Sequence, residues 1–165
     1  MNSKLIGVII AVIVIAAAVL VYYQFVDNGG NVNVEVADAP VGASAVYITF
    51  NNVYVHGTST GWQNFSVASK TIDILNLTAS NASLFGSISL KAGTYTQIKL
   101  GIVNVTVVMS GQKITFTSSN GYVDINTPFT VSAHSTTSLV IEFNLTQDLN
   151  MVAKTFTPSA SMVVS

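Results

Sequence analysis

The stretch Leu90-Lys91-Ala92-Gly93-Thr94-Tyr95-Thr96-Gln97-Ile98-Lys99-Leu100 decides the fold class, because it joins a tight turn to the alternation of a β-strand. Gly93 is suited to a positive φ in the turn. After it, the apolar Ile98 and Leu100 alternate with polar neighbours, which is the period of two of a strand with one buried face. We expect Tyr95 to close one end of the fold with its ring.

The same period runs through the chain after residue 31, in the apolar sets Val46, Ile48 and Phe50; Ile114 and Phe116; and Leu139, Ile141, Phe143 and Leu145. Turn residues separate these runs at 38–40, 57–61, 92–93, 110–111, 120–121 and 127–128. Eight or nine short strands with this spacing predict an all-β sandwich of two sheets, immunoglobulin-like or prealbumin-like. Only the stretch 79–85 is compatible with a short turn of helix.

Residues 5–26 have only one strongly polar member, Gln24, and predict a long hydrophobic α-helix that precedes the sandwich. A helix of about 22 residues is about 33 Å long, enough for a bilayer core. Lys4 before it and Asp27 after it place the N-terminus inside and the rest outside. The expected organisation is a helix over 1–26, a Gly/Asn linker over 27–31 and an extracellular sandwich over 32–165. The residues expected to insert in the membrane or to assemble are Leu5, Ile9, Val12, Ile15, Leu20, Tyr22 and Tyr23.

Three interpretations of this segment remain open. It is a simple membrane anchor, or it is the filament-core helix of a pilin, or it is a cleaved secretory signal with the small residues Ala16-Ala17-Ala18 as its site. The layout resembles that of archaeal pilins, whose helices form the core of a filament, although Ser3-Lys4-Leu5 departs from their usual processing signal. Cleavage at the alanines instead leaves the β-prone tail 19–26, which is suited to complete the sheet of a neighbouring subunit.

The charge content excludes one class of function and favours the cell exterior. Only 8% of the residues are charged, against about 25% in typical soluble chains. The formal net charge is −1 and all six basic residues are Lys, so the chain lacks the basic stripe of a nucleic-acid binder. It has no Cys and therefore no disulfide framework.

Three segments carry a resemblance to a known family: 34–40 (Val-Glu-Val-Ala-Asp-Ala-Pro), 46–56, and the Leu-x-x-Gly-x-Tyr-x-x-Ile-x-Leu pattern of 90–100. Over residues 32–165 the chain resembles an uncharacterised domain family of archaeal and bacterial cell-surface proteins. This resemblance implies a sandwich exported to the surface and assigns no functional residues.

Asn-x-Ser/Thr sequons support the same compartment. They are Asn64, Asn76, Asn81, Asn104 and Asn144. Their positions near loops or on polar strand faces make them reachable by a transferase, and we expect N-linked glycans on the chain and no other cofactor.

No catalytic or metal site is expected. His56 and His134 stand apart at the ends of predicted strands, the few carboxylates lack a clustered spacing, and no Gly-x-Ser-x-Gly motif occurs. Trp62 follows Gly61 and either packs at a sandwich edge or stacks on a sugar. The sequence thus favours a non-enzymatic structural subunit of an extracellular, archaeal-type filament, with its own copies as partners. The alternative is a membrane-anchored monomer that binds a glycan, an S-layer or another protein.

Overall fold

The computed structural model describes residues 29–38, 43–75, 77–78 and 81–165. The predicted helix over 5–26 with its assembly residues, the sequon at Asn76 and the turn residues Ala39 and Pro40 lie outside these ranges. Within them, no helix has the length and apolar character needed to cross a membrane. Strand β1 begins at Gly29, inside the predicted linker.

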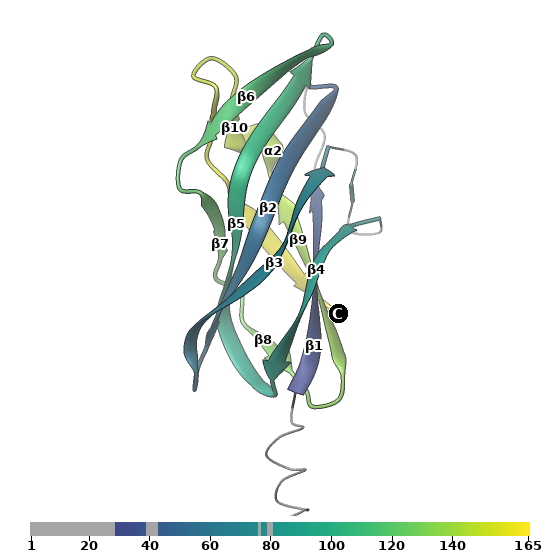
Figure 1. The fold of residues 1–165 in the computed structure, drawn as a ribbon, viewed down its shortest axis with the longest axis vertical. Coiled ribbons are helices and arrows are strands. Elements are labelled where there is room, and N and C mark those ends of the chain that lie inside the picture. The colour runs from purple at the N-terminus through teal and green to yellow at the C-terminus, as the bar shows by residue number, and fades with distance from the viewer. Residues whose placement is uncertain (1–28, 39–42, 76, 79–80) are drawn as a thin grey trace, which may run out of the picture.

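Two sheets face each other, and nearly all of the described chain is β-structure (Figure 1). The strands are β1 (Gly29–Asp38), β2 (Ala45–Gly57), β3 (Gly61–Asp73), β4 (Ser83–Lys91), β5 (Gly93–Met109), β6 (Gln112–Ser118), β7 (Tyr122–Ile125), β8 (Phe129–Val131), β9 (Thr136–Phe143), β10 (Leu149–Asn150), β11 (Thr155–Phe156) and β12 (Ala160–Val164). The smaller sheet has the order β12-β9-β1-β4. The larger has the order β10-β11-β6-β5-β2-β3, with β7 and β8 also paired to β5. The predicted two-sheet, all-β architecture is confirmed.

Most neighbouring strands are antiparallel, and two pairs are parallel. β1 runs parallel to β9, with Val34 opposite Leu139, and β11 runs parallel to β6. A parallel pair needs a long connection. Here the connection from β1 to β9 contains β4 of the same sheet and six strands of the large sheet, β2, β3 and β5 to β8.

A β-bulge at Asn51 interrupts the alternation of β2. The pairing with β3 shifts between Phe50 and Asn52, and the pairing with β5 shifts across the same place. From Val46 to the bulge the buried residues of β2 are even-numbered, and after it they are odd-numbered, beginning with Val53. A bulge has this effect because the extra residue reverses the faces of everything that follows. The residues after it that point outward are therefore Asn52, Tyr54 and His56.

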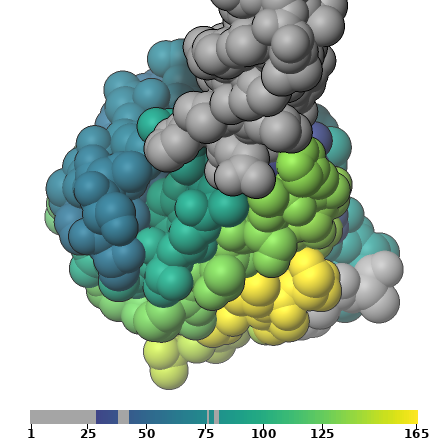
Figure 2. Space-filling view, turned by 90° about the horizontal axis from the view of Figure 1, so that it is seen from below, coloured from purple at the N-terminus to yellow at the C-terminus, as the bar shows by residue number. Residues whose placement is uncertain are grey.

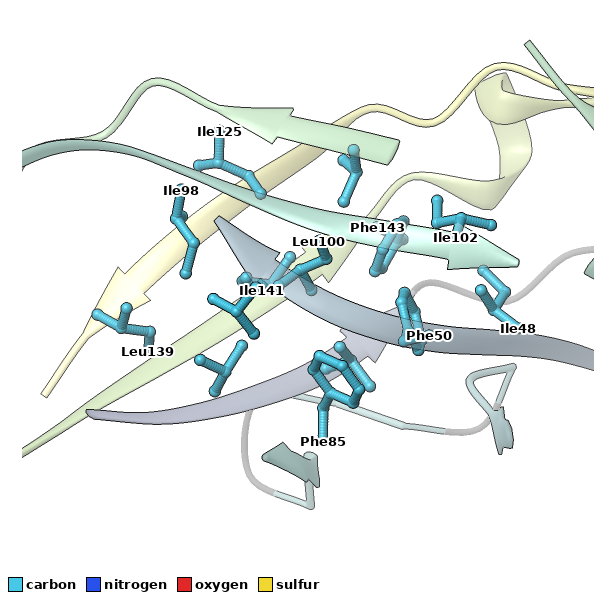
Figure 3. Close-up of a cluster of buried hydrophobic side chains, with 14 of the residues drawn as sticks. Ile48, Phe50, Phe85, Ile98, Leu100, Ile102, Ile125, Leu139, Ile141 and Phe143 are labelled. Carbon is cyan, nitrogen blue, oxygen red and sulfur yellow. The ribbon is translucent and has the colours of Figure 1, made fainter. Parts of the chain in front are cut away.

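Phenylalanine rings join the two sheets through the core (Figure 3). Phe50 of β2 lies 5.3 Å from Phe85 of β4 and 5.9 Å from Phe143 of β9, measured between ring centroids. Phe143 in turn lies 6.4 Å from Phe156 of β11. These tilted contacts are the geometry that aromatic pairs prefer, so the chain of rings fixes how the sheets face each other.

The edges of the two sheets meet along two seams. β3 lies beside β4, where the Lys70 ammonium donates a hydrogen bond to the Leu84 carbonyl oxygen. On the other side β12 lies beside β7. An exposed strand edge can pair with a strand of another chain, and a charged residue on the edge makes such pairing less favourable.

The turn that feeds β5 behaves as the sequence predicts. Tyr95 is buried, stacks on Phe129 with 5.3 Å between centroids, and donates its hydroxyl to the Lys91 carbonyl across the turn. Left-handed glycines occupy the predicted turns at Gly111 (φ +77°) and Gly121 (φ +67°), where a side chain would be strained.

Three local predictions are wrong. The alternation through Leu145 predicts one strand, but β9 ends at Phe143 and a single helical turn, α2 (Leu145–Asp148), follows, with Leu145 fully buried. In the stretch 79–85, residues 83–85 belong to β4 rather than to a helix. The strands are not all short, since the bulges allow β2, β3 and β5 to run past residues that break the strict period.

Removing the ring of Phe50 tests its place in the core. We expect Phe50→Ala to lower the free energy of unfolding by about 3–5 kcal/mol, because the loss of this buried ring leaves a cavity between the two sheets. Urea unfolding of the full-length protein in detergent measures it. Tyr47→Ala, on the outer face of the same strand, should cost less than about 1 kcal/mol. Equal losses in the two variants would contradict the role given to Phe50.

Candidate functional site

The outer face of the large sheet carries a cluster of aromatic side chains around one lysine. We call this cluster the aromatic platform and define it as Tyr54 and His56 of β2, Trp62 of β3, Lys99 of β5 and Tyr122 of β7. Trp62 is 48% exposed and Tyr122 38% exposed, whereas the other large aromatics of the sandwich core are buried. Its members come from four strands that lie side by side in the sheet.

Strand register brings these side chains together. His56 lies opposite Trp62, and Tyr54 lies opposite Asn64 on one side and Lys99 on the other. Lys99 lies opposite Asp124 of β7. Directly opposite residues on one face have Cβ atoms about 4.5–5.5 Å apart, so they form contacts across the strands.

Lys99 is the centre of the platform. Its Nζ lies 4.7 Å from the centroid of Trp62, 4.8 Å from that of Tyr122 and 3.2 Å from Oδ2 of Asp124. The His56 ring meets Trp62 edge-on with 5.2 Å between centroids, and its Nδ1 is 2.9 Å from the Thr96 hydroxyl oxygen. A cation held between two rings and a carboxylate loses much of its freedom, so the rings are held in place before any ligand arrives.

A shallow depression of about 250 Å³ lies within the platform. It is lined by Tyr54, Trp62, Gln63, Asn64 and Lys99. This volume is below the roughly 300–1,000 Å³ of pockets that take drug-sized ligands, so it fits one ring-sized group. Apolar ring faces beside amide, hydroxyl and ammonium groups match a pyranose, which presents C–H groups on its faces and hydroxyls at its rim.

A second depression, of about 410 Å³, follows the seam between β3 and β4. It is lined by Ser66 to Lys70 on β3 and by Phe85 to Ser87 on β4. Phe85, its largest side chain, is buried in the core.

All four sequons in the described ranges have exposed asparagines: Asn64, Asn81, Asn104 and Asn144. The sequence predicts exposure of Asn144 from strand alternation, but the reason is different, because Asn144 is the N-cap residue of α2. Asn104 donates its amide to the hydroxyl oxygen of its own sequon residue Thr106, at 3.2 Å. Asn64 belongs to the rim of the platform.

The two histidines belong to different elements of the fold. His56 belongs to the platform, and His134 lies in the turn between β8 and β9 with a left-handed φ of +57°. In the part of the chain that the structure describes, no three His, Asp or Glu side chains gather into a possible metal site.

A buried carboxyl group lies at the opposite edge of the large sheet. Asp148 of α2 is 3% exposed, and its Oδ1 accepts a hydrogen bond from the Ser159 hydroxyl at 2.5 Å. Its Oδ2 is buried without a hydrogen-bond partner. Burial raises the pKa of Asp148, and hydrogen bonds from Ser159 and Asn144 only partly oppose this effect.

Sequence reasoning finds part of the platform and misses the rest. It singles out Trp62 and His56 separately, with stacking on a sugar as one alternative for Trp62. Tyr54, Lys99 and Tyr122 give no signal of their own, because they are ordinary outward residues of different strands. The signal that could reveal them is the change of parity after Asn51, which places Tyr54 and His56 on one face.

Comparison with known proteins gives one match. The family model described as a domain of unknown function (DUF4382) matches residues 29–158, which is most of the chain. No curated protein matches the chain. No solved structure matches it either.

The buried carboxyl of Asp148 predicts a pH dependence of stability. Because its pKa is raised in the folded state, its protonated form is favoured by folding. The stability that protonated Asp148 contributes to the fold is fully present below its ordinary pKa of 3.8 and is lost as the pH rises through the raised pKa. We expect Asp148→Asn, which keeps the shape and removes the charge, to gain stability relative to the wild type as the pH rises. Thermal unfolding of both proteins from pH 3 to 8 measures the difference, and a difference that is constant with pH would contradict it.

Proposed function

We propose that this chain, which belongs to the DUF4382 family, is a non-enzymatic cell-surface protein whose aromatic platform binds carbohydrate. The N-terminal segment would hold the protein at the membrane and the sandwich would stand outside. Partners would be glycans of the cell surface or of an S-layer.

The observation that carries the proposal is the exposed Trp62 within a pre-organised, ring-sized depression. Trp62 keeps 48% of its surface exposed although Lys99 and His56 already contact it. Exposed aromatic patches on a soluble domain mark binding sites, because their exposure costs free energy that only a ligand recovers. The Asn64 side-chain amide at the rim supplies hydrogen bonds suited to ligand hydroxyls.

Two further features support a place outside the cell. The exposed sequons at Asn64, Asn81, Asn104 and Asn144 are acceptors that only exported chains use. The scarcity of charge leaves a surface that associates readily, which a coat of glycans would counter.

Truncation of Trp62 tests the proposal. We expect full-length, unglycosylated protein in detergent to bind one or more members of a panel of neutral, N-acetylated and uronate oligosaccharides. Trp62→Ala should weaken that binding about tenfold or more, which corresponds to about 1.4 kcal/mol for a lost stacking contact. Calorimetric titration measures it.

Tyr47→Ala is the matched control, since Tyr47 lies on the outer face of β2 before the bulge and outside the depression. It should bind as the wild type does. Binding that survives Trp62→Ala unchanged, or no binding to any oligosaccharide of the panel, would refute the proposal.

A second candidate function is the filament subunit. One observation favours it: Val152, in the loop between β10 and β11, is 95% exposed, with Met151 beside it. The Asn150 side-chain oxygen accepts hydrogen bonds from the backbone N–H groups of Val152 and Ala153 and so fixes the conformation of this loop. The loop lies at the end of the sandwich opposite to the start of β1 (Figure 1), where a subunit in a polymer would meet the next copy.

Val152→Ser tests this second candidate. If Val152 is buried between copies, its loss should raise the concentration needed for assembly about tenfold, because a buried valine contributes about 1.5 kcal/mol. Electron microscopy of surface material from cells that express each variant measures filament abundance. Val163→Ser, an exposed valine on β12, is the control. Filaments unaffected by Val152→Ser, or surface filaments without this chain, would rule out this form of assembly.

A further inference from the structure

Strand β3 places a sequon and an aromatic ring side by side. Trp62, Asn64 and Ser66 are the exposed members of its alternation, and Phe65 between them turns inward against the core. Residues two apart in a strand point to the same side, about 6.8 Å from each other along the chain. The acceptor asparagine and the hydroxyl residue of the sequon therefore share one face with Trp62.

The neighbouring strand completes the surroundings of Asn64. Tyr54 lies directly opposite Asn64, and His56 lies opposite Trp62. Asn64 itself lines the depression that Tyr54, Trp62 and Lys99 form. The first sugar attached to its amide nitrogen would thus start inside the platform, with an aromatic ring on the same strand and another across from it.

The sequons at Asn104 and Asn144 lack this arrangement. At Asn104 the residue two positions earlier is Ile102, which is buried, and the residue opposite is Thr49. At Asn144 the residue two positions earlier is Glu142, and the chain enters α2. Asn104 lies on the same outer face of the large sheet, so it is an internal reference for a glycan that does not start beside Trp62.

We propose that an N-linked glycan on Asn64 lies over the aromatic platform and closes it to other carbohydrates. In the modification step, the side-chain amide nitrogen of Asn64 forms a C–N bond to the anomeric carbon of a polyprenyl-phosphate-linked oligosaccharide. The C–O bond to the carrier phosphate breaks, the carrier leaves with its phosphate oxygen, and the amide gives up one proton.

Covalent attachment makes the glycan a strong competitor. A group tethered by a short link has an effective concentration in the millimolar range at a neighbouring site, so it outcompetes free sugars that bind weakly. Stacking against the ring also shields Trp62, whose exposure is otherwise costly. The closing of the platform to other carbohydrates rests on the proposed carbohydrate binding. The contact between the Asn64 glycan and the platform does not.

The sole tryptophan of the chain is Trp62, so its fluorescence reports on this site alone. The experiment compares three forms of the full-length protein, each secreted from a host with N-linked glycosylation. In one form only Asn64 carries a sequon, the others being removed by Thr78→Ala, Ser83→Ala, Thr106→Ala and Thr146→Ala. The reference form has Ser66→Ala in addition and is unglycosylated, with Asn64 retained. A third form keeps only the Asn104 sequon.

We expect mass spectrometry to find sugar on Asn64 in the first form. Iodide quenching of Trp62 should fall by about half relative to the reference, since a stacked sugar covers most of a side chain that is 48% exposed. The form glycosylated only at Asn104 should be quenched like the reference. Absence of sugar on Asn64 when Asn104 is occupied, or quenching that its glycan leaves unchanged, would overturn the inference.

Binding to the oligosaccharide panel separates this inference from the proposed function. If the reference binds an oligosaccharide and the Asn64-glycosylated form binds it at least tenfold more weakly, both stand. If the reference binds nothing while the Asn64 glycan still shields Trp62, the proposed function fails and the contact between glycan and platform stands. If both forms bind equally, the function stands and closure of the platform by the glycan is overturned.

Discussion

The β-bulge at Asn51 is the constraint on which both faces of the large sheet depend. It lies immediately after Phe50, whose ring contacts Phe85 and Phe143 of the opposite sheet. By adding one residue to β2 at this point, the bulge turns Val53 and Val55 into the core and Tyr54 and His56 out of it. Without the extra residue, two aromatic side chains would enter the core and two valines would face solvent. The interior packing and the exterior platform are therefore two results of one local distortion.

Lys99 organises the outer face in the way that Phe50 organises the inner one. It lies opposite Asp124 and contacts two rings that belong to strands on either side of β5. Gly101 of the same strand leaves room for Asn51 and Asn52, since a side chain there would collide with the Asn51 amide oxygen. In a chain with few charges, one ion pair placed among aromatic rings has few competitors, and this favours a single arrangement of the platform.

The sequence predicts the class of fold because the period of two depends only on local burial, which Ile98 and Leu100 or Leu139 and Ile141 show directly. It does not predict the parallel pairing of β1 with β9, because no local pattern records which distant strand becomes a neighbour. It also misses α2, since Leu145 continues the alternation of β9 while its burial comes from a helical turn. Of the platform, only Trp62 and His56 are conspicuous in the sequence, as rare residue types. The remaining members depend on register across three strand pairs, and a register shift of one residue would place them on the other face.

The platform lies at the end of the sandwich where β1 begins, and this position determines where a glycan on Asn64 would lie. The β2–β3 hairpin and the start of β5 lie at the same end as Gly29, where the chain enters the domain (Figures 1 and 2). Trp62 follows directly after that hairpin, with Gly61 in the left-handed conformation at its corner (φ +66°). If residues 5–26 hold the protein at a membrane, this end is the one nearest the lipid. A glycan on Asn64 would then occupy the space between sandwich and membrane, whereas the loop at Val152 would point away from the cell. Carbohydrate contact at the near end and contact with other copies at the far end are compatible on one molecule, because the length of the sandwich separates them.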